Sequence, residues 1–140
     1  MRNDFLDLLM DETRCDLDSP SEWNNAYLFY FEILKGLEQT LPKTVVNGIQ
    51  VARHYHAGTA TAFQLEAARA GTWAILGKDS LGETPKGAAI RAALFFISEP
   101  DPQDGPLDTV SIFASFALKA GVPQSALETA FRRTWCQDQI

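Results

Sequence analysis

The sequence predicts an all-α protein, a single-domain bundle of six or seven helices over residues 1–140. Breaking residues divide the chain into segments of helical length, and apolar residues recur within these segments at helical spacing. The alternation that is typical of strands is nearly absent, and only residues 45–46 and 94–97 could compete as strands. The chain has 140 residues, of which 46% are apolar, and this suits one hydrophobic core.

The first two expected helices lie in the acidic N-terminal part of the chain. Residues 3–14 can form a short amphipathic helix whose apolar side holds Phe5, Leu6, Leu9 and Met10. The run Ser-Pro-Ser-Glu at residues 19–22 is typical of a helix start, with a serine cap, a proline in the first helical position and a glutamate that completes a capping box. This helix should end near residue 41, before a proline. Residues 1–18 are expected to be an acidic segment that could be mobile.

The later helices are each bounded by proline, glycine or threonine-proline signals. They are expected at residues 42–55, in the alanine-rich stretch that ends at residue 77, at residues 85–98, at residues 107–120, and from residue 123 onward. Residues 99–106 contain three prolines and a glycine, which indicates an irregular, solvated loop. The alanines of the fourth and fifth helices indicate close helix packing, with Phe63, Trp73 and Leu76 as the large side chains between the helices.

The second helix is apolar or aromatic all round its axis from Ala26 to Phe31. Such a helix is expected to be wrapped by others in the centre of the core, or else to leave one face for a partner. Tyr27 and Tyr30 would suit an interface, because their hydroxyl groups can stay in contact with water.

The net charge of −6 lies entirely in the first third of the chain. Residues 1–42 hold nine acids and three bases, whereas residues 43–140 hold nine of each. An acidic surface repels phosphate backbones and anionic lipids, so binding to nucleic acid or to a membrane surface is not expected. A basic protein partner would be attracted instead. The alternative is that the charge only keeps the protein in solution.

The sequence also bears on where the protein acts. No apolar run reaches the length of a bilayer span, and the start of the chain lacks the apolar stretch of a signal peptide. We therefore expect a cytoplasmic protein without membrane contact. Cys15 and Cys136 are expected to be unpaired thiols in that compartment.

Acidic residues next to aromatic ones form the candidate partner-binding surface. Aromatic side chains within an acidic rim are the usual arrangement for gripping a basic protein. The candidate contact residues are Asp11, Glu12, Asp16, Asp18, Glu22, Trp23, Tyr27 and Tyr30.

No catalytic signature or cofactor motif is recognisable in the sequence, and no cofactor is expected. His54 and His56 point about 200° apart on a helix, so they cannot bind one metal ion together. Either histidine could act as a general base, but no orienting acid or nucleophile is identifiable by spacing. The acids of residues 99–108 do not follow the spacing of a calcium loop.

Three short runs carry a resemblance to a known group of proteins. Residues 52–61 read Ala-Arg-His-Tyr-His-Ala-Gly-Thr-Ala-Thr, residues 65–69 read Leu-Glu-Ala-Ala-Arg, and Trp73-Ala74 follows. These runs resemble the Ala-Arg-x-Tyr-x-x-Gly, Leu-x-x-Ala-Arg and Trp-Ala elements of bacterial toxin-immunity proteins. The resemblance implies a small helical cytoplasmic protein that binds and blocks one toxin without catalysis of its own. It carries over no functional residues.

The sequence therefore leads to one main hypothesis and two alternatives. The main hypothesis is a non-catalytic, stoichiometric inhibitor, an immunity protein whose acidic and aromatic surface binds a cognate toxin. The first alternative is a helical adaptor or subunit of a larger complex, in which the apolar second helix docks permanently. The second is a small enzyme that uses His54 or His56.

Overall fold

A computed structural model gives the structure of the protein. It describes the backbone of residues 4–13 and 17–135 and the side chains of residues 6–11 and 17–135. In this part of the chain, the fold consists of helices alone. This confirms the predicted all-α class. The α-helices are α1 (Asp4–Thr13), α2 (Trp23–Leu37), α3 (Lys43–His56), α4 (Ala62–Leu76), α5 (Pro85–Phe96), α6 (Leu107–Lys119) and α7 (Gln124–Trp135), and a 3-10 turn, η1 (Pro20–Glu22), precedes α2. Neither candidate strand forms: residues 45–46 lie within α3, and residues 94–97 form the end of α5 and its C-cap residue, Ile97.

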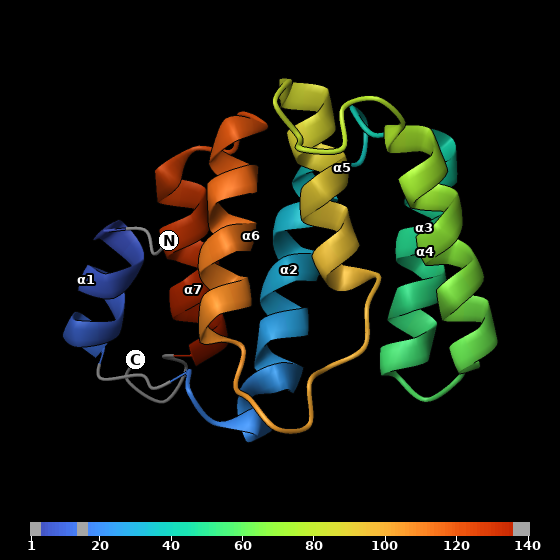
Figure 1. The fold of residues 1–140 in the computed structure, drawn as a ribbon. Helices are drawn as coiled ribbons and strands as arrows, with labels where there is room; N and C mark the ends of the chain where they lie inside the picture. Colours follow the sequence, from blue (N-terminus) through green and yellow to red (C-terminus); the bar gives the residue numbers. More distant parts are fainter. Residues whose placement is uncertain (1–3, 14–16, 136–140) are drawn as a thin grey trace.

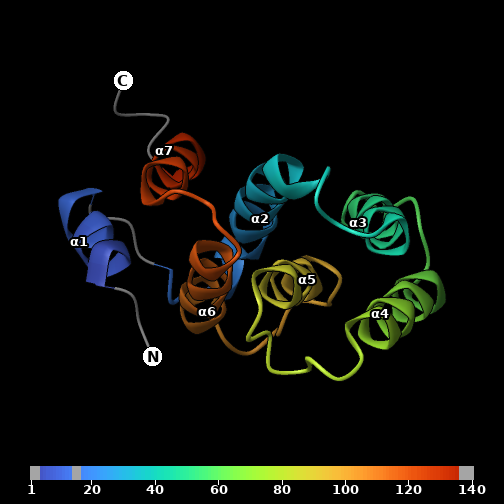
Figure 2. The same ribbon diagram turned by 90° about the horizontal axis from the view of Figure 1, so that it is seen from above.

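The helices form two layers that run side by side (Figure 1). Seen from above, α7, α2 and α3 form one layer, α6, α5 and α4 form the other, and α1 lies beside α7 (Figure 2). The central helix α2 contacts α3, α5, α6 and α7, as expected of a helix in the centre of the core, but one stripe of it stays open and Leu28 is 63% exposed. No helix in the described part of the chain combines the length and the apolar character needed to cross a bilayer.

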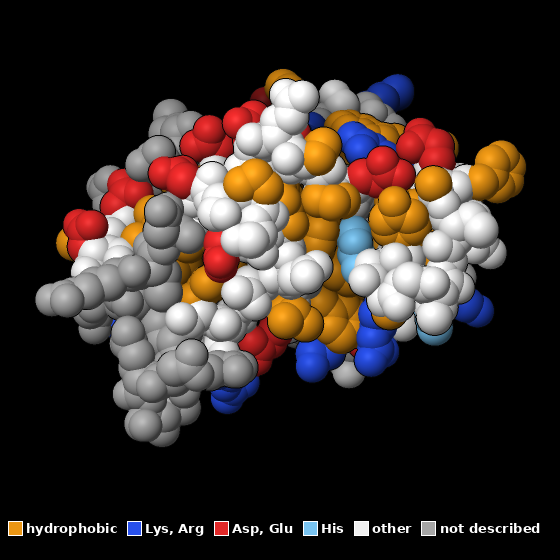
Figure 3. All heavy atoms as spheres, turned by 90° about the horizontal axis from the view of Figure 1, so that it is seen from below, with side chains coloured by type: hydrophobic (Ala, Val, Ile, Leu, Met, Phe, Trp, Pro, Cys, Tyr) orange, Lys and Arg blue, Asp and Glu red, His pale blue; other side chains and the backbone are white. Residues whose placement is uncertain are grey.

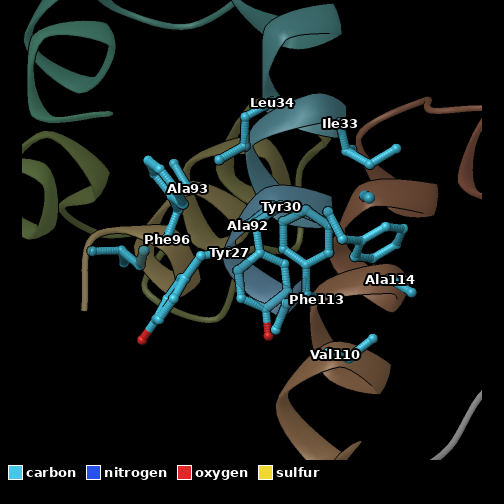
Figure 4. Close-up of a cluster of buried hydrophobic side chains, with 14 of the residues drawn as sticks. Tyr27, Tyr30, Ile33, Leu34, Ala92, Ala93, Phe96, Val110, Phe113 and Ala114 are labelled. Atoms are coloured by element: carbon cyan, nitrogen blue, oxygen red, sulfur yellow. The ribbon is translucent and has the colours of Figure 1, made fainter. Parts of the chain in front are cut away.

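The core is centred on the aromatic side chains of α2 (Figure 4). Tyr30 is fully buried, and its ring lies 4.4 Å from the ring of Phe113, centroid to centroid. The Tyr30 hydroxyl donates to Thr109 Oγ1 at 3.3 Å, so the buried polar group is satisfied. One turn earlier on α2, the ring of Tyr27 packs edge-on against Tyr30 and against Phe96 of α5. These rings join α2 to both α5 and α6.

Helix starts show where the expected capping was right and where it was wrong. Thr84 caps α5 by accepting from Gly87 N at 3.0 Å, as the threonine-proline signal predicts. The capping box expected at residues 19–22 is absent: Ser19 accepts from Ser21 N, and Glu22 instead accepts from the Trp135 indole at 2.8 Å. The 3-10 turn takes the place of a first α-helical turn there, and α2 ends at Leu37 instead of near residue 41.

Helix α4 lies at the edge of the fold, and here the expected packing is wrong. Only a narrow stripe of α4 faces α3 and α5, so Leu76 is buried while Phe63 is 83% exposed and Trp73 is 37% exposed. Close packing does occur where α3 crosses α4. A Cβ on Gly48 would lie 3.2 Å from Thr72 Oγ1 and 3.6 Å from the Ala68 carbonyl oxygen. The alanines of α5 are buried as expected.

The N-terminal helix packs on the rest of the protein through its apolar side. Leu6 and Leu9 are 1% and 2% exposed, and α1 contacts α7. Leu17, which precedes η1, is fully buried. These contacts place the acidic N-terminal segment against the C-terminal helix.

Candidate functional site

Aromatic donors from α2 and α3 hold the segment that follows α5. The Trp23 indole Nε1 donates to the carbonyl oxygens of Asp101 and Asp104 at 2.9 and 2.8 Å. The Tyr27 hydroxyl donates to the Ser98 carbonyl oxygen at 3.2 Å, and His56 Nε2 donates to the Phe96 carbonyl oxygen at 2.8 Å. Residues 99–104 are exposed, as expected of a solvated loop, and the side chains of α2 and α3 also hold the backbone of this segment.

A glycine brings this loop against the start of the fold. A Cβ on Gly105 would overlap the backbone of Leu17 and Asp18, so only glycine permits this approach. The Tyr55 hydroxyl also donates to the Glu99 carboxylate at 3.1 Å, and this hydrogen bond raises the pKa of Tyr55. The loop therefore spans from α3 to the segment before α2.

Four aspartates line one pocket as a result. The pocket has a volume of about 500 Å³, and the described residues that line it are Asp18, Trp23, Asp101, Asp104, Gly105, Leu107, Asp108 and Thr109. No lysine or arginine is among them. Four aspartates and the Trp23 side chain line the same space, which gives the pocket a negative potential and an aromatic wall. We call this the acidic pocket.

The acidic pocket does not have the arrangement of a metal site. Within the described residues, no group of three or more His, Cys, Asp or Glu side chains is placed to hold one metal ion. The four aspartates line a pocket of about 500 Å³, and no three of them are close enough together to hold one ion. A ligand with several separated cationic groups, such as the lysines and arginines of a protein surface, matches this arrangement better.

The structure brings together only some of the predicted contact residues. Asp18 and Trp23 lie in the acidic pocket, and Asp11 is exposed on α1. Glu22 is half-buried and holds the Trp135 indole. The Glu12 side chain and Asp16 lie outside the described residues, as do Cys15 and Cys136.

The expectation that Tyr27 and Tyr30 are surface contacts is wrong. Tyr27 is 5% exposed and Tyr30 is fully buried, because the faces of α2 that carry them pack against α5 and α6. Burial raises the pKa of both tyrosines, and both hydroxyl groups are used inside the protein. Asp101, Asp104 and Asp108 are exposed, as the sequence predicts, and they also line the acidic pocket. Their proximity to Asp18 carries no sequence signal.

A second hollow lies between α2 and α3. It has a volume of about 460 Å³ and is lined by Asn24, Tyr27, Leu28, Phe31, Arg53, His56, Ala57 and Phe96. His56 stacks on Tyr27 with ring centroids 3.7 Å apart, and burial lowers the pKa of its imidazole. On the face drawn in Figure 3, hydrophobic side chains gather beside a histidine, with Lys and Arg at the edge of this hydrophobic band. We call this hollow the α2–α3 groove.

The two histidines have structural partners. His56 bonds a backbone carbonyl, and the exposed His54 Nδ1 lies 3.1 Å from Thr59 Oγ1. In the described part of the chain, neither imidazole is hydrogen-bonded or ion-paired to a carboxylate. A general base needs an orienting acid and a reacting group within reach. The contacts of these two imidazoles are with a backbone carbonyl and a threonine hydroxyl group.

Comparisons with protein-family models, with curated protein sequences and with solved structures found no match to this chain. The fold and the site define it as an all-α protein with an acidic pocket at one end of α2 and an apolar groove beside the same helix.

Proposed function

We propose that this protein is a non-catalytic inhibitor that binds a basic protein partner through a surface that includes the acidic pocket. The observation that carries the proposal is that Asp18, Asp101, Asp104 and Asp108 line one pocket together with Trp23. A large aromatic side chain within a charged rim is the usual centre of a protein interface. The negative potential would speed the approach of a basic partner.

The partner class comes from the sequence resemblance. If the chain is a bacterial immunity protein, the partner is a cognate toxin, and the complex forms in the cytoplasm. Toxins that act on nucleic acids carry basic surfaces, which fit an acidic inhibitor, although the charge does not choose among toxin activities. The inhibitor would bind one toxin molecule and cover a surface that the toxin needs.

A double charge reversal in the pocket tests the proposal. The variant D101K/D104K changes two pocket carboxylates, and E66K/E83K is the matched control because it makes the same change of net charge at exposed residues outside the pocket. Each tagged protein is used to capture partners from native cells, and from cells that express the product of the adjacent upstream reading frame, at low and high salt. Toxicity of the captured partner is then measured with and without this protein.

The outcomes separate the hypotheses. One stoichiometric, salt-sensitive partner that is lethal without this protein supports the inhibitor, and D101K/D104K should then associate about tenfold more slowly at low salt than the control. Equal association by both variants would remove the acidic pocket from the interface. A stable assembly of several subunits, or the absence of any partner, would contradict the inhibitor proposal.

One observation favours the alternative of an adaptor or subunit. Phe63, Ala67, Ala70 and Ala74 lie at helical spacing on the exposed side of α4, and Phe63 is the most exposed of the large apolar side chains. An exposed apolar stripe can bind another protein. A subunit of this kind should self-associate when it is purified alone, and the variant F63S should reduce that association. A monomer at all concentrations would contradict this alternative.

A further inference from the structure

We propose that the α2–α3 groove binds a small amphiphilic carboxylate, with the apolar body of the ligand on α2 and its carboxylate at Arg53. This inference does not depend on the acidic pocket or on the inhibitor function. The groove is distinct from that pocket, because the two share no lining residue.

The apolar side of the groove follows two turns of α2. Asn24, Tyr27, Leu28 and Phe31 lie at positions i, i+3, i+4 and i+7, a stripe about 10 Å long. Leu28 is 63% exposed, although Tyr27 and Phe29, which flank it in the sequence, are buried. Phe96 and Tyr27 close the floor. A volume of about 460 Å³ lies within the usual range for small-molecule sites, which are mostly apolar with a few polar groups.

The charges at the groove are cationic. The Arg53 guanidinium carbon lies 4.9 Å from the centroid of the Phe31 ring, and Lys35 Nζ lies 5.5 Å from the same ring. The described residues that line the groove include no carboxylate. Arg53 and Lys35 are exposed, and no ion pair is found for either within the described part of the chain. A ligand carboxylate would complete this charge arrangement, because guanidinium and carboxylate groups match in shape and charge.

The charge of the whole protein favours a small ligand over an acidic protein segment. The net charge is −6, and its repulsion grows with each negative charge that a ligand carries. A ligand with one carboxylate gains the local attraction of Arg53 and meets the least repulsion. A polyacidic peptide would meet much stronger electrostatic repulsion. The observations therefore favour a single carboxylate attached to an apolar body.

The histidine in the groove forms part of its wall and does not bind the ligand carboxylate. His56 stacks on Tyr27, and its Nε2 is already used by the Phe96 carbonyl oxygen. Burial favours its neutral form, so its ring forms an apolar wall and not a second cation. The carboxylate is thus directed to Arg53 at the rim.

Matched amphiphiles test the proposal. Decanoate, decylammonium and acetate are titrated into the whole protein at physiological salt, with the amphiphiles below their micelle-forming concentrations, while backbone amide NMR shifts are followed. Decanoate should shift the amides of residues 24–31 and 53–57 and should bind there about fivefold or more tightly than decylammonium. Acetate should not bind, because it lacks the apolar body. Residue-specific shifts are needed because decylammonium is also attracted to the acidic pocket.

Two pairs of surface variants give the control. R53Q should weaken decanoate binding about fivefold, whereas R132Q on α7 should not change it. L28E places a charge on the apolar stripe and should abolish binding, whereas L81E, at a leucine of similar exposure elsewhere (63% and 69%), should have no effect. These side chains are exposed, so the variants should fold, which far-ultraviolet circular dichroism checks.

Several results would overturn the proposal. These are no shift at the groove with decanoate, equal affinity for decanoate and decylammonium there, or unchanged decanoate binding by R53Q. A fourth is binding at the groove by an acidic amphipathic peptide in the absence of binding by decanoate, since this would assign the groove to a protein segment.

Discussion

The rings of Trp23 and Tyr27 stack with centroids 5.7 Å apart, and each ring lines a different site. Trp23 forms a wall of the acidic pocket, whereas Tyr27 forms the floor of the α2–α3 groove and stacks in turn on His56. One turn of α2 thus separates an anionic site from an apolar site with a cationic rim. A change in the position of either ring should displace the other ring and so change the shape of the other site, because closely packed rings leave little free space.

Replacing Trp23 with phenylalanine should release the loop from α2. W23F keeps a ring beside Tyr27 but loses the donor that holds the Asp101 and Asp104 carbonyl oxygens. We expect a loss of about 0.5–1.5 kcal/mol in the free energy of unfolding, measured by urea denaturation. Hydrogen exchange at the amide of Gln103 should become faster. W73F, at a half-exposed tryptophan on α4, is the control and should not change exchange in the loop.

Two glycine-to-alanine changes should have opposite effects on stability. In G105A the new methyl group meets the backbone of Leu17 and Asp18, and we expect a loss of about 1–3 kcal/mol in the free energy of unfolding. In G36A the methyl group meets no atom within 4 Å, and Gly36 lies inside α2, so we expect a gain of about 0.5–1 kcal/mol. Denaturation of the two variants in parallel measures both effects. A stable G105A protein would show that the loop can shift away without loss.

Acid should destabilise the protein through His56. Burial lowers the pKa of this imidazole below its ordinary value of 6.5, so the unfolded chain binds the proton at a higher pH than the folded chain. The contribution of His56 to stability is therefore fully present above pH 6.5 and is lost as the pH falls from 6.5 through the folded pKa. In H56Q, whose side-chain amide can still donate to the Phe96 carbonyl oxygen, this part of the pH dependence should vanish. Thermal denaturation across this window in both proteins provides the measurement, and an unchanged slope in H56Q would contradict the assignment.

Charge reversal in the N-terminal segment tests the rest of the predicted surface. D11K/D16K/D18K should slow association with the partner and flatten its dependence on salt, while the fold stays unchanged. Stopped-flow association at several salt concentrations measures both quantities. If binding survives the triple change intact, the segment before Trp23 is not part of the interface.

The helices could be predicted from local sequence signals, whereas the burial or exposure of individual side chains on them could not. Thr84 and Pro85 mark the start of α5 because a cap acts over three residues and needs no tertiary contact. The exposure of Phe63 depends on α4 being an edge helix, which is a property of the whole arrangement. The same holds for Tyr30: an aromatic residue suits a core and an interface equally well, and only its packing against Phe113 decides between them.

The acidic pocket shows the limit of sequence reasoning more clearly. Asp18 and Asp104 are far apart in the sequence. Gly105 brings them together, because a residue without a side chain can lie against the Leu17–Asp18 backbone. The excess of acidic residues in the sequence lies in residues 1–42, whereas residues 43–140 are neutral overall. The pocket nevertheless takes one aspartate from the first part and three from the second. Contacts at long sequence separation leave no local pattern.

The walls of the acidic pocket come from residues 18, 23 and 101–109, and the aromatic donors that hold the loop come from α2 and α3. These parts meet only after most of the chain has been synthesised and has collapsed, because closing such long loops is a late and slow event in folding. A nascent or partly folded chain would therefore present scattered carboxylates without the pocket. The acidic pocket becomes complete only when the chain has reached its native topology.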